Sequence, residues 1–111
     1  MLLVIVLGID RRVVDLFVMF FRDSGDRVFS EDPGKAVEMV MENLRKYSGM
    51  VKMYMRFYWG SVEQALTNPD LLIGGICREN EEVCERLESN REWFKQFLEK
   101  LYGELKEFMG K

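Results

Sequence analysis

The feature that most constrains the fold is a helical periodicity of polar and apolar positions across residues 33–67. Asp32 and Pro33 start a helix there, the aspartate as N-cap and the proline at the first helical position. Polar and glycine positions then recur at three- and four-residue steps, at Glu38, Glu42, Arg45, Gly49, Lys52, Arg56, Gly60 and Glu63. The opposite series is Val37, Met41, Leu44, Ser48, Val51, Met55, Tyr58 and Val62. This periodicity predicts one long helix over about residues 33–67.

Two glycines are the weak points of this long helix. Ser48 and Gly49 look like a helix C-terminus, and Gly49 and Gly60 each weaken a helix by about 1 kcal/mol relative to alanine. We therefore leave a kink or a break at either glycine open. Asn68 and Pro69 end the element, because proline disfavours helical geometry in the residue before it.

Residues 50–58 have a second interpretation, as a strand. An extended chain would put Lys52, Tyr54, Arg56 and Tyr58 on one face, where cations and aromatic rings bind single-stranded nucleic acid. The only charges within residues 50–59 are Lys52 and Arg56, one helical turn apart. We therefore prefer the helix and keep the strand as the alternative.

The N-terminal residues 2–30 favour strands. Residues 2–7 are wholly aliphatic, residues 13–21 are rich in β-branched and aromatic side chains, and Gly25 lies in a hairpin-like turn before residues 28–29. We predict a three-stranded antiparallel meander here. A helix over residues 10–24, stopped by Gly25, is the competing interpretation.

The C-terminal part reads as a strand followed by a helix. Residues 71–77 form a short aliphatic run in which Gly74 and Gly75 indicate a bulge or a close backbone approach. Asn80 caps a helix over residues 80–109, which has a second capping pattern at residues 89–92. Heptad positions can be assigned along it to Cys84, Arg91, Leu98 and Leu105 and to Leu87, Phe94, Leu101 and Phe108.

The predicted fold class is α+β, in a single domain of residues 1–111. A small, mainly antiparallel sheet (residues 2–30 and 71–77) packs with two long helices (about 33–67 and 80–109). This order of hairpin, helix, strand and helix resembles that of the roadblock class of dimerising modules, with no sequence motif in common. The resemblance concerns fold alone and carries no site residues.

The sequence offers few groups for catalysis. It has no histidine, hence no Ser-His or Cys-His pair and no default general base near neutral pH. Cys77 and Cys84 have no further cysteine or histidine to complete a zinc site, and we expect both to be free, half-buried thiols. We predict no cofactor, no metal and a non-enzymatic role, with carboxylate chemistry or a Cys77 thiol as the enzymatic alternative.

Charge and hydropathy limit the partners. The net charge is −3, and only residues 33–67 are basic, with five basic and three acidic side chains, so binding to nucleic acid or anionic lipid over the whole surface is not expected. Residues 1–7 lack the basic leader of a signal peptide, and no apolar run approaches the ~20 residues that span a bilayer. We predict a cytoplasmic protein without a membrane partner. The single threonine, two glutamines and absent histidine hint at a thermophile.

The apolar circumference of residues 50–59 leads to the functional prediction. One small sheet cannot cover it, and such surfaces mark association. We expect a homodimeric scaffold or adaptor, leave another protein partner open, and rank nucleic acid below both. The predicted interface comprises Met50, Met53, Phe57, Trp59, Leu87, Phe94, Leu98, Leu101, Leu105 and Phe108.

Overall fold

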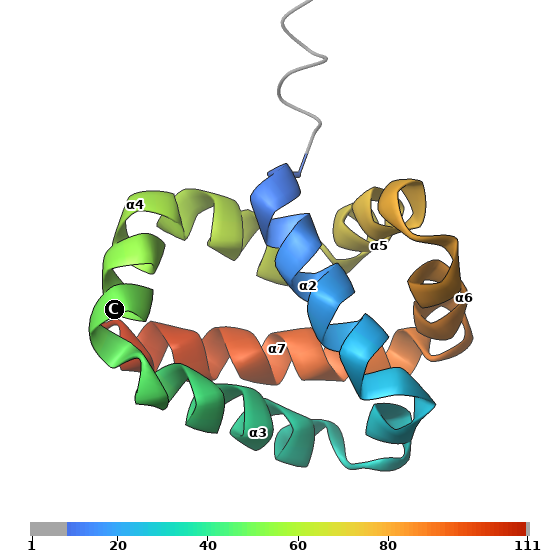
Figure 1. The fold of residues 1–111 in the computed structure, drawn as a ribbon, viewed down its shortest axis with the longest axis horizontal. Helices are drawn as coiled ribbons and strands as arrows, with labels where there is room; N and C mark the ends of the chain where they lie inside the picture. Colours follow the sequence, from blue (N-terminus) through green and yellow to red (C-terminus); the bar gives the residue numbers. More distant parts are fainter. Residues whose placement is uncertain (1–8, 111) are drawn as a thin grey trace, which may run out of the picture.

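The computed structural model describes residues 9–110, and this part of the chain consists of helices joined by short connections (Figure 1). Its elements are α2 (Arg11–Ser24), the 3₁₀ helix η1 (Gly25–Ser30), α3 (Pro33–Lys46), α4 (Ser48–Thr67), α5 (Pro69–Glu79), α6 (Glu81–Ser89) and α7 (Arg91–Phe108). Residues 9–110 contain no strand, so the predicted α+β class is wrong. Because the described residues form no sheet, the resemblance to the fold layout of the roadblock class is not supported either.

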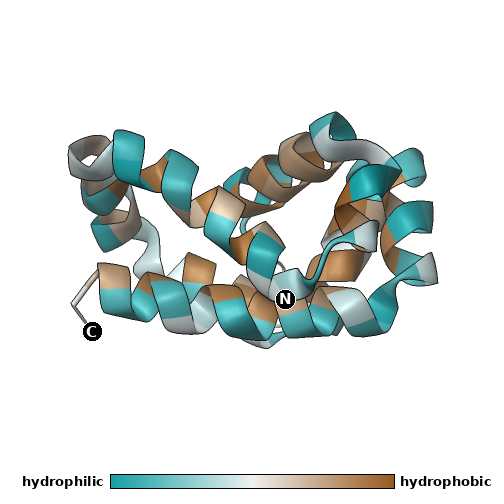
Figure 2. Cartoon of the chain, turned by 90° about the horizontal axis from the view of Figure 1, so that it is seen from below, coloured by the Kyte–Doolittle hydropathy of each residue, from teal (hydrophilic) through white to brown (hydrophobic). Residues whose placement is uncertain are grey.

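The helices are arranged around α7. Helix α3 packs alongside α7, and α2 passes in front of α7 (Figure 1). Helices α4 and α5 lie on opposite sides of α2, and α6 returns the chain from α5 to α7. Hydrophobic positions of the helices face one another across this arrangement (Figure 2). All residues classed as fully buried among those described are apolar.

From residue 11 onward the predicted meander is replaced by α2 and η1. Asp10 caps α2 by accepting a hydrogen bond from the backbone N–H of Arg12 at 2.9 Å, and Gly25 ends it with a φ of 65°, a conformation that glycine adopts without strain. Val13, Val14 and Phe21 are buried. Helical burial therefore overrides the strand preference of the β-branched residues. The predicted strand over residues 2–7 lies outside the described residues.

The predicted strand over residues 71–77 is also wrong, because this segment belongs to α5. Leu72, Ile73 and Ile76 are buried at helical spacing. The close approach expected at the glycine pair occurs at Gly75, where an added Cβ would lie 3.0 Å from Cγ2 of Val14. Glycine here lets α5 pack directly on α2.

The predicted helix over residues 33–67 is two helices. Residues 50–58 are helical, as preferred, and Asp32 caps α3 through a 2.9 Å hydrogen bond from the backbone N–H of Gly34. The chain breaks at Tyr47 (φ −121°, ψ 35°) and kinks at Tyr58 (φ −113°, ψ 19°). Each deviation precedes one of the two weak glycines by two residues. The unbroken helix is therefore wrong, although its predicted weak points are close to the real ones.

The C-terminal helix divides as well. Asn80 caps α6 by accepting from the backbone N–H of Val83 at 2.9 Å, and α7 begins after Asn90, where the second capping pattern lies. Cys77 of α5 and Cys84 of α6 form a disulfide, so the prediction of two free thiols is wrong. This bond ties the α5–α6 corner together.

Candidate functional site

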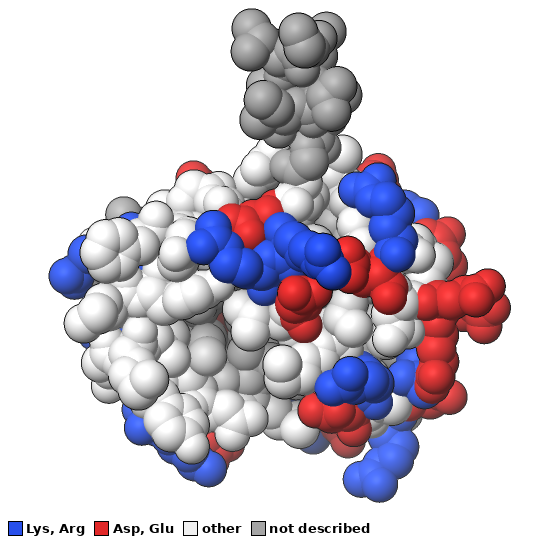
Figure 3. All heavy atoms as spheres, turned by 45° about the horizontal axis from the view of Figure 1, so that its top comes forward, with Lys and Arg blue, Asp and Glu red and all other residues white. Residues whose placement is uncertain are grey.

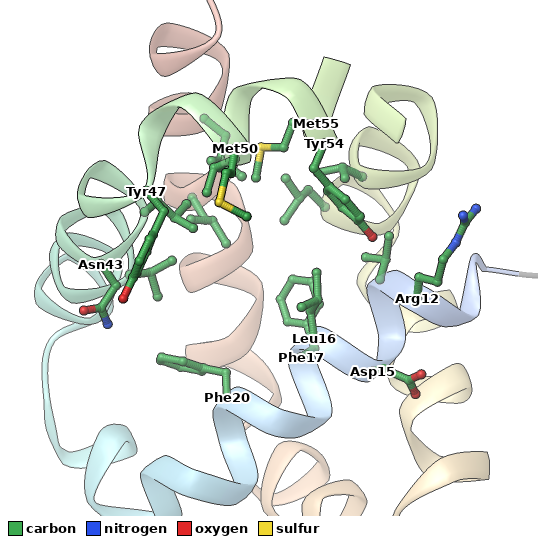
Figure 4. Close-up of a pocket in the computed structure, with 18 of the residues that line it drawn as sticks. Arg12, Asp15, Leu16, Phe17, Phe20, Asn43, Tyr47, Met50, Tyr54 and Met55 are labelled. Carbon is green, nitrogen blue, oxygen red and sulfur yellow. The ribbon is translucent and has the colours of Figure 1, made fainter. Parts of the chain in front are cut away.

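A cavity of about 750 Å³, open to the surface, lies between α2, α3, α4 and α7 (Figure 4). Pockets of roughly 300–1,000 Å³ hold drug-sized ligands. The walls are mainly apolar and include Phe17 and Phe20 of α2, Leu44 of α3 and Leu101 of α7. The cavity is large enough to be a binding site for an apolar group.

The cavity exists because the first half of α4 stands away from the core. Within residues 48–57 no side chain is fully buried, whereas Val62, Ala65 and Leu66 beyond the kink are. The break at Tyr47 and the kink at Tyr58 bend α4 into an arch over α7 (Figure 1). The arch leaves a space that no described side chain fills.

Charged groups lie only at the mouth of the cavity. The Arg12 guanidinium donates to the Asp10 carboxylate at 2.9 Å and stacks over the Tyr58 ring at 4.0 Å. The hydrogen bond between them raises the pKa of Arg12 and lowers the pKa of Asp10, so both stay ionised and neutralise each other. The Arg12 and Asp15 side chains turn outward from the cavity (Figure 4). The interior therefore suits an uncharged, apolar occupant.

Neutral polar groups stand at two places on the mouth. The Asn43 amide and the Tyr47 hydroxyl lie near each other at one end, and the Tyr54 hydroxyl points toward Arg12 at the other (Figure 4). These three groups have no hydrogen-bond partner within residues 9–110. They are available to an occupant that carries a donor or an acceptor.

Exposed apolar side chains flank the cavity, and we call them the apolar rim. They are Leu16 and Met19 of α2 and Met50, Met53 and Phe57 of α4. The α4 members are 76%, 63% and 79% exposed, at a spacing that places them on one stripe of the helix. Figure 3 shows a broad surface with few charges, while charged side chains gather on the remaining surface in that view. An apolar rim around an apolar cavity is typical of an association site.

The predicted interface residues separate into two groups. Met50, Met53 and Phe57 are exposed, as association requires. Trp59 is half-buried, with its ring stacked on that of Tyr102 at 6.4 Å. The predicted members from α6 and α7 serve the chain's own core, with Leu87, Phe94, Leu98, Leu101 and Leu105 buried and Phe108 packed against them. Heptad spacing describes both intramolecular and intermolecular packing, which is why it misled here.

The residues proposed for nucleic acid do not form a flat platform. On a helix they are distributed around the axis, with the Tyr54 and Tyr58 rings 4.7 Å apart and Tyr58 covered by Arg12. The Lys52 ammonium lies 5.0 Å from the Phe108 ring, and Arg56 is exposed. The four side chains therefore lack the shared face that the strand interpretation required.

The α2 wall and rim were missed by the sequence reasoning, because residues 13–21 were assigned to a strand. The sequence signal for these α2 residues was the helical spacing of Val13, Phe17 and Phe21, with Leu16 and Phe20 beside them.

Among residues 9–110 no group of three or more histidine, cysteine, aspartate or glutamate side chains is placed to hold a metal ion. Within the same residues no helix is both long and apolar enough to span a bilayer. Cys77 has no free thiol for the proposed chemistry, because it forms a disulfide with Cys84.

Comparisons of the chain with models of protein families, with curated proteins and with solved structures find no match. The function is therefore argued from the cavity and the apolar rim.

Proposed function

We propose that the chain is a non-enzymatic interaction module that forms a homodimer through the apolar rim. The observation that carries the proposal is the exposed stripe of Met50, Met53 and Phe57 along α4. Contiguous apolar surface of this kind is rare on a monomeric protein unless it binds something. Covering it with protein removes these side chains from water, which is the main favourable term in association.

A second copy suits this surface for geometric reasons. A two-fold dimer requires a self-complementary surface, because the same patch faces itself. The rim offers a ridge on α4 beside the exposed Leu16 and Met19 of α2, so the α4 ridge of one copy can lie against the α2 side of the rim of the other. Two of the ridge residues are methionines, whose flexible side chains adapt to an irregular partner surface.

Charge also favours the rim over the rest of the surface. Two copies that each carry a net charge of −3 repel each other at most orientations. The rim itself is uncharged, so pairing there places no like charges directly against each other. This supports one specific dimer over non-specific association.

The test is the mass of the chain in solution by size-exclusion chromatography with light scattering. We expect about 26 kDa for the natural chain, twice its 13.1 kDa, and 13.1 kDa for the double variant Met53→Glu, Phe57→Glu. Leu71→Glu is the matched control, because Leu71 is an exposed apolar residue on α5 outside the rim. A natural chain of 13.1 kDa at every concentration up to millimolar would contradict the proposal.

Two further predictions, on nucleic-acid binding and on location, stand beside the homodimer. Binding of single-stranded nucleic acid stays a prediction, without the platform that motivated it. The cytoplasmic location also stays a prediction, and a disulfide at that location is typical of intracellular proteins from hyperthermophiles.

A further inference from the structure

We propose that the cavity is the docking site of the chain's own N-terminal segment, residues 2–7. These six consecutive residues are aliphatic and uncharged, with the sequence LLVIVL. They lie outside the described residues and are separated from Ile9 in the sequence by Gly8. The inference goes beyond the homodimer, because it concerns what fills the cavity, whose lining shares Leu16 and Met50 with the apolar rim but does not include Met53 or Phe57.

The attachment point of the segment lies close to the cavity. Asp10 caps α2, and Arg12 in the first turn already contributes to the cavity mouth. Ile9 packs against the core beside Gly75 of α5, which fixes where the chain enters. The segment therefore joins the chain at the end of α2 that carries Arg12, on the α5 side of the helix.

The segment is long enough to line the cavity. The six residues of the segment span roughly 20 Å when extended, at about 3.3 Å each. Helix α2 has 14 residues and is about 21 Å long at about 1.5 Å per residue. The segment can thus cross the start of α2 and follow the cavity wall as far as Phe20.

The chemistry of the cavity fits this occupant. Apolar side chains form its interior, and the charged groups at its mouth point outward or neutralise each other. A peptide also brings backbone groups that need hydrogen-bond partners. The unpartnered Asn43 amide and Tyr47 and Tyr54 hydroxyls stand at the mouth to receive them (Figure 4).

Tethering favours the chain's own segment over a separate apolar molecule. A short connection gives a tethered group an effective concentration in the millimolar range. A free lipophile or the segment of another copy must compete with that concentration. Burying the segment also removes from water the most continuous aliphatic run of the sequence.

The first test uses an apolar fluorescent probe, anilinonaphthalene sulfonate, on the full-length chain. Because aspartates in the segment disfavour its burial, the double variant Val4→Asp, Val6→Asp is expected to bind the probe on the order of tenfold more tightly than the natural chain. A deletion of residues 2–8 should do the same, and circular dichroism checks that both variants stay helical. Equal probe affinity in the natural chain and both variants would overturn the inference.

The second test is NMR on the natural chain. We expect nuclear Overhauser effects between methyl groups of residues 2–7 and the rings of Phe17, Phe20 and Tyr54. Observing them only between differently labelled copies would overturn the inference in favour of exchange between chains. Finding a co-purified lipid in the cavity and no contact from the segment would overturn it in favour of a lipophile.

A rim variant separates this inference from the homodimer. The double variant Met53→Glu, Phe57→Glu should be monomeric and still keep the contacts between residues 2–7 and the cavity rings. Loss of the dimer with these contacts intact refutes neither proposal. A monomeric natural chain with the contacts present refutes only the homodimer, and a dimer without the contacts refutes only the docked segment.

Discussion

The two ends of this helical protein are packed in opposite ways. Around the start of α7, the rings of Phe21, Phe94 and Phe97 lie 5.5 to 6.4 Å apart and all three are fully buried. The Trp93 indole N–H donates to the Glu31 carbonyl at 2.8 Å and ties this end to the loop before α3. Under the first half of α4, by contrast, the chain leaves about 750 Å³ unfilled.

The difference shows that the hollow end does not result from a lack of apolar side chains. Met50 borders the hollow and Met53 and Phe57 are exposed beside it, yet none of the three fills it. The arch of α4, set by Tyr47 and Tyr58, holds them there. One end thus stabilises the fold, and the other presents apolar surface for binding.

The largest expected effect contrasts a substitution at each end. Phe94→Ala should lower the free energy of unfolding by about 3–5 kcal/mol, because it opens a void in close-packed rings. Leu44→Ala should cost less than half as much, since Leu44 already borders the cavity. Urea denaturation measures both. Equal losses would show that the two ends are equally packed.

The next effect concerns the disulfide at the packed end. Replacing Cys77 and Cys84 with serine should lower the free energy of unfolding by about 2–3 kcal/mol, because the unfolded chain regains the entropy of a short loop. The affinity of the cavity for an apolar probe should not change, as the disulfide lies in α5 and α6. A change in probe affinity would mean that the two ends are coupled.

A smaller effect comes from two neighbouring glycines of α5. Gly74→Ala meets no atom within 4 Å and should stabilise the protein by about 0.5–1 kcal/mol, because alanine favours helix. Gly75→Ala places its Cβ 3.0 Å from the buried Val14 and should leave the protein less stable than Gly74→Ala. Thermal unfolding of the pair measures the difference. Equal stability would show that α2 and α5 are not in close contact.

The smallest effect concerns the contact that holds the second half of α4 to α7. The Tyr102 hydroxyl donates to the Glu63 carboxylate at 2.6 Å, which raises the pKa of Tyr102 above its ordinary value of 10.0. A raised pKa in the folded state stabilises the fold below pH 10, and this stabilisation is lost as the pH rises through the folded value. Ultraviolet titration should show one tyrosine ionising late in the natural chain and earlier in Glu63→Gln. Identical titration curves would contradict this contact.

The sequence predicts helix caps and helical periodicity well, and it predicts the packing between helices poorly. The caps at Asp32 and Asn80 and the restart near Asn90 follow from short-range chemistry and are confirmed. Helix over residues 50–58 follows from periodicity and is confirmed. These features depend on residues a few positions apart, which a sequence displays directly.

The fold class depends on longer-range facts. Residues 13–21 and 71–77 are short, mostly apolar runs, for which strand and buried helix look alike. The disulfide needs α5 and α6 to meet at a corner, and the cavity needs the bend of α4. Exposure of Met50, Met53 and Phe57 was expected from the sequence, whereas the second wall on α2 required the structure.

The most direct test of the hollow end as a binding surface is NMR of methionine methyl groups over a range of protein concentration. Met19, Met50 and Met53 lie on the apolar rim, and fully buried Met41 is an internal control. We predict that the three rim signals shift between micromolar and millimolar concentration while the Met41 signal stays in place. Rim signals that do not move, or that move no more than Met41, would contradict the account.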